Sequence, residues 1–215
     1  MSRLLFLATA LAASLAFAQQ GHQPMHHHFS DAEHWAQVFD DPARAEWQKP
    51  DQVIAALALA PDARVADIGS GTGYFSVRLA RAVPQGKVYG ADLEPDMVKY
   101  LNARAAKEKL PNLSSILAAP DDPRLPEPVD LVLLVDTYHH IGDRADYFAK
   151  LRDRLRPSGR VAIIDFKADS PTGPPRSGRV APEEVEKEMI RAGYRRVAAH
   201  DFLPYQYFLV FAPSG

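Results

Sequence analysis

The chain carries the segment Arg64-Val65-Ala66-Asp67-Ile68-Gly69-Ser70-Gly71-Thr72-Gly73. Its first five residues are mostly apolar and predict a short buried strand. Three glycines in the next five positions let the backbone turn sharply and approach a ligand closely, because glycine has no Cβ. The pattern over 74–82 then predicts a helix, whose first N–H groups favour an anionic group. In an open α/β sheet, a turn of this kind lies where ligands bind.

The spacing of these glycines separates the turn from two better-known nucleotide-binding loops. The glycines follow G-x-G-x-G, whereas a dinucleotide-binding fingerprint needs G-x-G-x-x-G. Counted from Gly69 the third glycine of that fingerprint falls on Tyr74, and counted from Gly71 it falls on Ser76. The sequence also lacks the G-x-x-x-x-G-K-[ST] pattern of a phosphate-binding P-loop. A tight strand-to-helix turn without any ligand remains the alternative interpretation.

Strand and helix patterns alternate on both sides of the turn, which predicts a mostly parallel sheet with helices on both faces. We expect strands at 64–68, 86–91, 113–117, 129–135, 160–166, 196–200 and 205–211. We expect helices at 30–40, 50–60, 74–82, 95–108, 144–155 and 182–192, with Ser30 as the N-cap of the first. The last two strands are joined by a short turn, so they form an antiparallel hairpin, since a parallel link needs a dozen or more residues. The fold class is therefore α/β, a three-layer, doubly wound, mostly parallel sheet with a C-terminal antiparallel hairpin.

A carboxylate marks the end of the second predicted strand. Asp92 lies 21 residues after Gly71, and a carboxylate in this place can accept hydrogen bonds from a ribose diol. The alternative role is an N-terminal cap for the helix that Pro95 opens.

These features together resemble the class I S-adenosylmethionine-dependent methyltransferases. The matching segments are 65–74, 88–92, 129–133 and 155–160, and the resemblance covers about residues 50–212. It implies a Rossmann-like, seven-stranded sheet with an antiparallel last strand, and S-adenosyl-L-methionine as cofactor. The cofactor-binding residues that it implies are Asp67, Gly69, Gly71, Asp92, Leu93, Asp121 and Val135.

The resemblance also implies a role for each part of this set. Asp67 and the backbone of the glycine turn would contact the methionine part, Asp92 the ribose hydroxyls, and Leu93 the adenine. The loop Ala119-Pro120-Asp121-Asp122 would offer one carboxylate to the adenine amino group. Which of these two aspartates does so stays open.

Catalytic candidates follow the fourth predicted strand, in Val135-Asp136-Thr137-Tyr138-His139-His140. Methyl transfer needs alignment of the acceptor, and it needs a base only where the acceptor must lose a proton. We expect His139 or His140 to serve as that base near neutral pH, or else to pack under the sheet and line the pocket. Similar His-His pairs occur in relatives that methylate carbon or arsenic, but the arsenic chemistry relies on cysteine and this chain has none. Tyr205 either reaches the substrate side or belongs to the core of the sheet. Trp35, Phe39 and Trp47 either form a lid over the pocket or pack against the sheet.

The N-terminus predicts a signal peptide over residues 1–18, a polar, His-rich leader with one helix over 19–49, and a methyltransferase domain over 50–215. Arg3 precedes an apolar run that ends at Ala16-Phe17-Ala18, too short for a permanent membrane anchor, which is the alternative. We therefore expect export to the periplasm or secretion. Adjacent histidines in a leader cannot preorganise a metal geometry, so no metal site is assigned.

Composition narrows the function classes further. A formal net charge of −2 gives no general reason to bind nucleic acid, and the absence of cysteine excludes disulfides and thiol catalysis. We expect a methyltransferase that acts on a small molecule or an envelope component. The alternatives are a non-catalytic exported nucleoside-binding protein and a nicotinamide-dependent oxidoreductase. Oligomeric state is not predicted.

Overall fold

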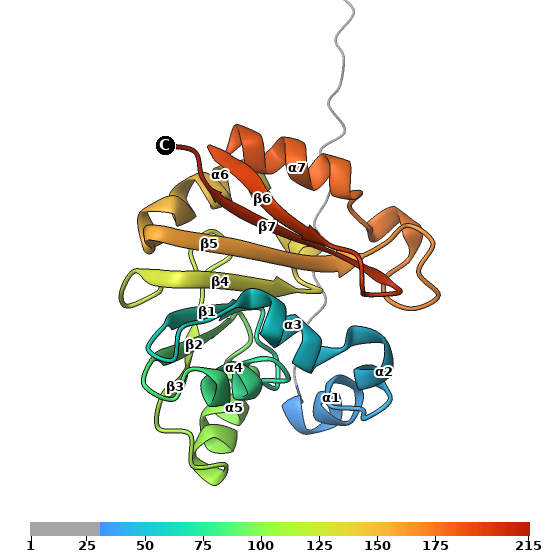
Figure 1. The fold of residues 1–215 in the computed structure, drawn as a ribbon. Helices are drawn as coiled ribbons and strands as arrows, with labels where there is room; N and C mark the ends of the chain where they lie inside the picture. The colour runs from blue at the N-terminus through green and yellow to red at the C-terminus, as the bar shows by residue number, and fades with distance from the viewer. Residues whose placement is uncertain (1–30) are drawn as a thin grey trace, which may run out of the picture.

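The computed structural model describes residues 31–215 (Figure 1). The predicted signal peptide, the histidines at 22–28 and Ser30 lie outside the described residues. Within residues 31–215, no helix combines the length and apolar character needed to cross a bilayer.

One seven-stranded sheet forms the centre of the molecule. Its strands are β1 (Arg64–Ile68), β2 (Lys87–Asp92), β3 (Leu113–Leu117), β4 (Val129–Val135), β5 (Leu155–Phe166), β6 (Tyr194–His200) and β7 (Gln206–Pro213). Their order is β3-β2-β1-β4-β5-β7-β6. The first five run parallel, and β7 is antiparallel to both β5 and β6. The predicted α/β sheet with a C-terminal antiparallel hairpin is confirmed.

Helices cover both faces of the sheet, as Figure 1 shows. They are α1 (Ala32–Phe39), α2 (Arg44–Gln48), α3 (Pro50–Leu57), α4 (Ser76–Ala82), α5 (Pro95–Lys107), α6 (Arg144–Leu151) and α7 (Pro182–Arg191). One apolar core joins α3, α4 and α5 to side chains such as Val65, Val88 and Leu133. The other joins α6 and α7 to the alternate side chains, such as Ala66 and Leu134. Alternation along each strand thus produces the three layers.

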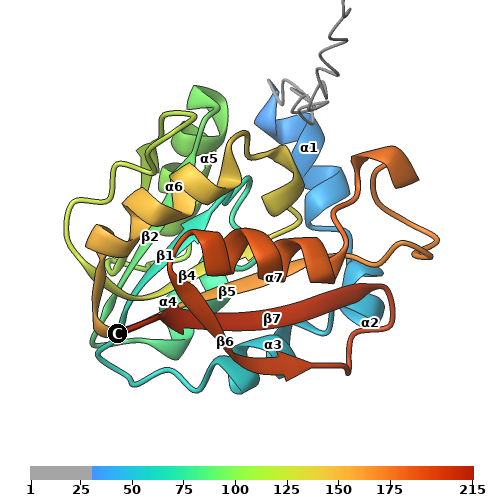
Figure 2. The same cartoon turned by 90° about the horizontal axis from the view of Figure 1, so that it is seen from above.

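The N-terminal helices lie at the end of the sheet where β4 and β5 end, as Figures 1 and 2 both show. Asp31, rather than the predicted Ser30, is the N-cap of α1, and its side chain accepts a hydrogen bond from His34 N. The short helix α2 was not predicted. It ends at Gln48, and the next residue, Lys49, adopts a left-handed backbone (φ 45°) that lets α3 begin at Pro50 in a new direction.

Several further boundaries differ from the sequence prediction: α3 already ends at Leu57, β6 begins at Tyr194 and β7 extends to Pro213. The helix α4 begins at Ser76, because Gly73 and the residues next to it still belong to the turn. The helix α6 ends at Leu151 and continues as a single 3-10 turn. Strand β5 begins at Leu155 rather than Arg160, because the predicted turn at 157–159 is a bulge inside the strand: Val129 pairs with Leu155 but Leu131 with Arg160.

Candidate active site

The glycine turn after β1 has the backbone that its sequence predicts. Gly69 and Gly71 have φ angles of 72° and 51°, in the left-handed region that favours glycine. A Cβ atom on Gly69 would lie 2.3 Å from Thr137 Oγ1, so the turn and the loop after β4 are in close contact. Gly69 N donates to Ala91 O at 2.8 Å, which fixes the turn to the end of β2.

Asp92 closes this turn from the neighbouring strand. Its Oδ2 accepts a hydrogen bond from Gly71 N at 2.8 Å and its Oδ1 accepts one from Glu94 N at 3.0 Å. Burial raises the pKa of this carboxyl above its usual range, and the two backbone donors oppose that shift. The N-cap of α5 is Glu94, so Asp92 does not cap that helix. The carboxylate instead ties the glycine turn to β2.

The edge beyond Asp92 is apolar and open. Leu93 is 49% exposed and Leu117, the register partner of Asp92 on β3, is 43% exposed. In the next loop Asp122 is used locally, because its backbone pairs with Ala119 and its Oδ1 accepts from Arg124 N. The Asp121 side chain is 76% exposed and lies 3.8 Å from Lys150 Nζ. Asp121 is therefore the more exposed of the two aspartates.

Two more predicted cofactor residues lie below the turn. Asp67 is 3% exposed, and its Oδ2 accepts a hydrogen bond from Ser76 Oγ at 2.5 Å. Burial raises the pKa of this carboxyl to about 6, against the lowering effect of the Ser76 hydroxyl. Val135, the last residue of β4, is buried at 8% exposure. Asp67 thus links β1 to the first residue of α4.

The loop after β4 begins with a carboxylate that the sequence analysis did not single out. Asp136 has a φ of 55°, and its oxygens accept hydrogen bonds from Gln48 Nε2 (3.1 Å), from Arg44 (3.3 Å) and from Gln206. Gln48 and Gln206 are fully buried. Burial raises the pKa of Asp136 to about 6, although Arg44 and Gln48 lower it. No local motif points to this network, because its members come from α2, the β4 loop and β7.

The two predicted histidines lie in the same loop, but in different settings. The ring of His139 is almost fully buried, and its Nδ1 lies 2.9 Å from both oxygens of Asp165, at the end of β5. The backbone N of His139 also donates to Asp165 Oδ2, at 3.2 Å. His140 is half-buried, with its ring centroid 4.1 Å from that of His139. Asp165 therefore holds His139 at two points.

A second anchor holds this loop on the face of the sheet that α6 and α7 cover. Tyr138 is fully buried, and its hydroxyl donates to Glu188 of α7 at 2.6 Å. Arg144 of α6 forms two hydrogen bonds with the same carboxylate, at 2.7 and 2.9 Å. The histidines therefore stand on a loop that is fixed at both ends.

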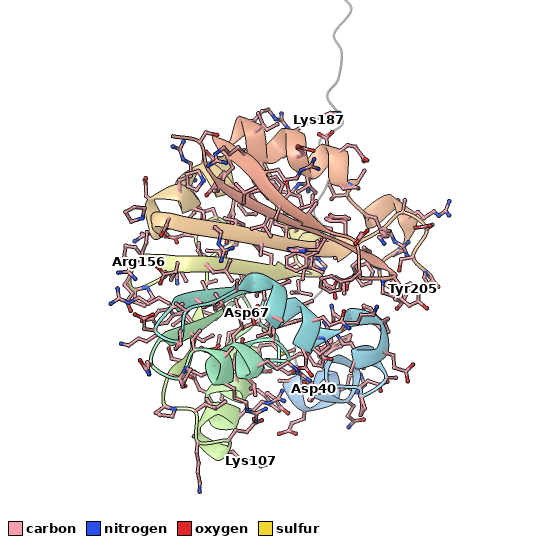
Figure 3. The ribbon with its side chains drawn as sticks, viewed as in Figure 1. Asp40, Asp67, Lys107, Arg156, Lys187 and Tyr205 are labelled. Atoms are coloured by element: carbon pink, nitrogen blue, oxygen red, sulfur yellow. The ribbon has the colours of Figure 1, made fainter. Side chains whose placement is uncertain are left out.

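The N-terminal helices contact both parts of the site. On α1, Phe39 lies 3.4 Å from where a Gly71 Cβ would be, and the adjacent Asp40 accepts from Thr72 Oγ1 at 3.0 Å. On α2, the Trp47 ring lies 6.2 Å from Phe166 and 6.0 Å from Tyr205, centroid to centroid. In Figure 3 Asp40 and Tyr205 lie at one end of the molecule, with Arg156 at the opposite end. The expected lid residue Trp35 stacks on Phe39 at 5.3 Å.

Comparison with known proteins places this geometry in a family. A family model described as a methyltransferase domain matches residues 65–159. The demethylmenaquinone methyltransferase of Deinococcus radiodurans is 31% identical over 126 residues, which is 57% of this chain and 48% of that protein. The arsenite methyltransferase of Halobacterium salinarum is 32% identical over 119 residues, which is 54% of this chain and 30% of that protein. The matched parts thus span less than half the length of either relative.

A solved structure extends the likeness to most of the chain. A SAM-dependent methyltransferase from Aquifex aeolicus has a TM-score of 0.77 at 26% identity, over 84% of this chain and 97% of that one. The residues that match the family model include the glycine turn. The chain belongs to the class I S-adenosylmethionine-dependent methyltransferases.

Proposed function

We propose that the protein binds S-adenosyl-L-methionine at the ends of β1 and β2 and methylates a small-molecule acceptor at the ends of β4, β5 and β7. The observation that carries this proposal is the joint between Asp92 and Gly71, a carboxylate hydrogen-bonded at 2.8 Å to a left-handed glycine turn. When bound, the cofactor supplies a methyl group on a positively charged sulfur.

The side chains around the turn fit this cofactor. Each Asp92 oxygen accepts one backbone hydrogen bond and keeps a second lone pair that a ribose hydroxyl can use. Leu93 and Leu117 provide exposed apolar surface for the adenine, and Asp121 an exposed carboxylate for its amino group. Asp67, near the end of β1, and Asp136, directly after the neighbouring strand β4, add acidic groups that suit a cation.

The proposed acceptor region differs in chemistry. It combines the buried network of Gln48, Asp136 and Gln206 with aromatic rings of α2, β5 and the β6–β7 turn. The helices α1 and α2 stand over this end of the sheet (Figure 2). A small organic molecule suits such surroundings better than a polymer does. A net charge of −2 provides no general electrostatic attraction for nucleic acid.

Isothermal titration with S-adenosylhomocysteine tests the cofactor part, with NAD as the comparison ligand. We expect binding of the first and no heat with the second, because the glycine spacing and the hairpin do not suit a dinucleotide. Release of S-adenosylhomocysteine from S-adenosylmethionine, in the presence of small-molecule acceptors, then tests transfer. Tight binding without turnover on any acceptor would support a non-catalytic nucleoside-binding protein instead.

Export through residues 1–18 forms a separate proposal. It is supported by the apolar run and the Ala16-Phe17-Ala18 segment. Expression with a C-terminal tag, followed by cell fractionation and N-terminal sequencing, tests it. Mature protein that starts near Gln19 outside the cytoplasm is the expected result, and full-length protein in the cytoplasm would contradict it.

A further inference from the structure

The contact between His139 and Asp165 determines which ring nitrogen carries the proton. Asp165 is 1% exposed, and Oδ1 and Oδ2 each accept one backbone hydrogen bond, from Phe166 N (2.8 Å) and His139 N (3.2 Å). Both oxygens also lie 2.9 Å from Nδ1 of the His139 ring. An ionised carboxylate can only accept hydrogen bonds, so Nδ1 must be the donor. In the neutral ring, Nε2 is then the nitrogen with the free lone pair.

The surroundings of Nε2 leave this lone pair accessible. His139 Nε2 makes no hydrogen bond with any residue in the range 31–215. In that range, the buried side-chain nitrogen and oxygen atoms without a hydrogen bond are Ser70 Oγ and Tyr74 Oη alone. Nε2 is therefore neither paired nor sealed in the core, although the ring itself is held rigidly. A fixed imidazole with an accessible lone pair is the arrangement that a general base requires.

The neighbours of the His139 ring are aromatic. Its centroid lies 6.5 Å from Phe166, which in turn lies 6.2 Å from Trp47. Tyr205 and Trp47 are both half-exposed, and their rings lie 6.0 Å apart. Flat apolar rings beside a polar base suit a planar aromatic molecule that carries one polar group.

Titratable groups from several elements lie around the pair. Asp136 at the end of β4 and Tyr207 on β7 interact electrostatically with Asp165, and the His140 ring contacts the His139 ring. Arg44 on α2 forms an ion pair with Asp136. None of them makes a hydrogen bond to the His139 ring.

We propose that His139 is the catalytic base for an aromatic or enolic O–H acceptor, and that Asp165 is its positioning residue. In this step the acceptor O–H proton passes to Nε2 while the oxygen forms a bond to the methyl carbon. The C–S bond breaks, and its electron pair stays on sulfur, which becomes the neutral thioether of S-adenosylhomocysteine. An amine needs no such base, because its nitrogen attacks with a free lone pair and loses the proton afterwards. The proposal rests on the proposed function for its cofactor.

A first experiment needs no turnover. Long-range ¹H–¹⁵N spectra of histidine-labelled full-length protein report the tautomer of each ring, and we expect His139 as the Nδ1–H form. Asp165→Asn brings an amide N–H to the carboxylate position and should convert His139 to the Nε2–H form or a mixture, while His200 serves as an unaffected reference. A wild-type Nε2–H tautomer, or an unchanged ring in Asp165→Asn, would overturn the positioning role even if cofactor binding is intact.

A second experiment uses the acidity of the acceptor. Release of S-adenosylhomocysteine is measured with catechol, with 4-nitrocatechol, which is ionised at the assay pH of 8, and with benzylamine. We expect turnover of the catechols and not of the amine. His139→Gln should lower kcat for catechol by about 100-fold or more, in the range of general base catalysis, and by less than tenfold for the ionised acceptor. Asp165→Asn should follow the same pattern with a smaller loss.

Control measurements distinguish a failure of this inference from a failure of the proposed function. Asp201→Asn changes an exposed aspartate and should leave all rates unchanged. If His139→Gln lowers kcat equally for both catechols, His139 has a merely structural role. If the wild-type protein prefers benzylamine, or turns over neither catechol, the proposed acceptor class is wrong. Failure of S-adenosylhomocysteine to bind wild type would instead refute the proposed function, while the tautomer result stands by itself.

Discussion

The two halves of the site differ in what forms them, because one is mainly backbone and the other mainly side chains. The cofactor half, at the ends of β1 and β2, is a bend of the main chain that Asp92 fastens through a hydrogen bond to Gly71 N. The acceptor half, at the ends of β4, β5 and β7, is a network of side chains from segments as distant as Gln48 and Gln206. Thr137, packed against Gly69, is where the two halves meet.

This difference teaches how each half tolerates change. A backbone bend in the left-handed region depends on glycine and fails when a Cβ is added. A buried side-chain network depends on every donor finding an acceptor, so it is sensitive to the loss of one partner and can be rebuilt with another set. One half can therefore stay constant while the other is reshaped for a different acceptor.

The largest expected effect comes from Gly69→Ala, at the contact between the halves. The new Cβ would lie 2.3 Å from Thr137 Oγ1, on a backbone with φ 72°. Left-handed strain and overpacking together should lower the free energy of unfolding by about 2–5 kcal/mol. Urea unfolding measures this loss, and S-adenosylhomocysteine affinity should fall with it.

Gly215→Ala is the matched control, because nothing lies within 4 Å of its added Cβ. It should unfold like wild type. A Gly69→Ala protein of wild-type stability would mean that the turn is not held against Thr137, and the close contact between the halves would have to be abandoned.

Asp92→Ala should have the next largest effect, on binding rather than on folding. Charged acceptors contribute about 1.5–3 kcal/mol per hydrogen bond, so the loss of two ribose contacts should weaken S-adenosylhomocysteine binding by about 100-fold or more. The backbone donors of Gly71 and Glu94 can turn to water, so the fold should survive. Calorimetry and circular dichroism measure the two quantities, with Asp62→Asn, an exposed aspartate, as control. Unchanged affinity in a folded variant would remove the ribose role.

One carboxylate of each half, the buried Asp67 and the half-buried Asp136, allows a pH comparison. Burial raises the pKa of each to about 6. Between about pH 4, where the unfolded chain ionises, and pH 6 the folded protein binds more protons, so wild-type stability falls as pH rises. Asn does not titrate, so both Asp67→Asn and Asp136→Asn should gain stability relative to wild type over this window, by up to about 3 kcal/mol.

The two variants should differ in their free energy of unfolding at pH 4. The Asp67 side chain accepts a hydrogen bond from Ser76 Oγ, and an amide oxygen can accept the same bond. The stability of Asp67→Asn at pH 4 should therefore be close to that of wild type. At pH 4 the protonated Asp136 carboxyl can still accept at both oxygens from Arg44, Gln48 and Gln206. The NH2 group of an asparagine cannot accept, so Asp136→Asn should be less stable than wild type at this pH. Urea unfolding at several pH values measures both. A flat difference across the window in either variant would contradict the raised pKa of that carboxyl.

Sequence patterns predicted the cofactor half well because its signals are local. The strand, the glycine spacing and Asp92 fall within 30 residues, and each reports a backbone requirement that only certain residues meet. The sheet and its hairpin followed from apolar alternation and connection length in the same way. The bulge that lengthens β5 was missed because Pro157 and Gly159 are also the residues that end a helix.

The acceptor half could be predicted only in part. His139 and His140 were found because two titratable rings follow a buried strand, but the partner of His139 could not be, since Asp165 lies on another strand. The helix α2 has only five residues and no side-chain cap, so no periodicity marks it. Gln48 and Gln206 are ordinary polar residues in the sequence, and only their burial in the folded protein shows that they form a network.

The smallest expected effect concerns the apolar edge of the cofactor half. Leu93 is already 49% exposed, so Leu93→Ala should leave the free energy of unfolding nearly unchanged. If its side chain packs on the adenine, its truncation removes contact area worth about 1 kcal/mol, which weakens S-adenosylhomocysteine binding by about three- to tenfold. Val197→Ala is the matched control, because Val197 is a 40% exposed apolar residue on β6, at the opposite edge of the sheet. Equal affinity in the two variants would show that the exposed leucine has no part in holding the cofactor, and would restrict the cofactor half to its backbone bend and Asp92.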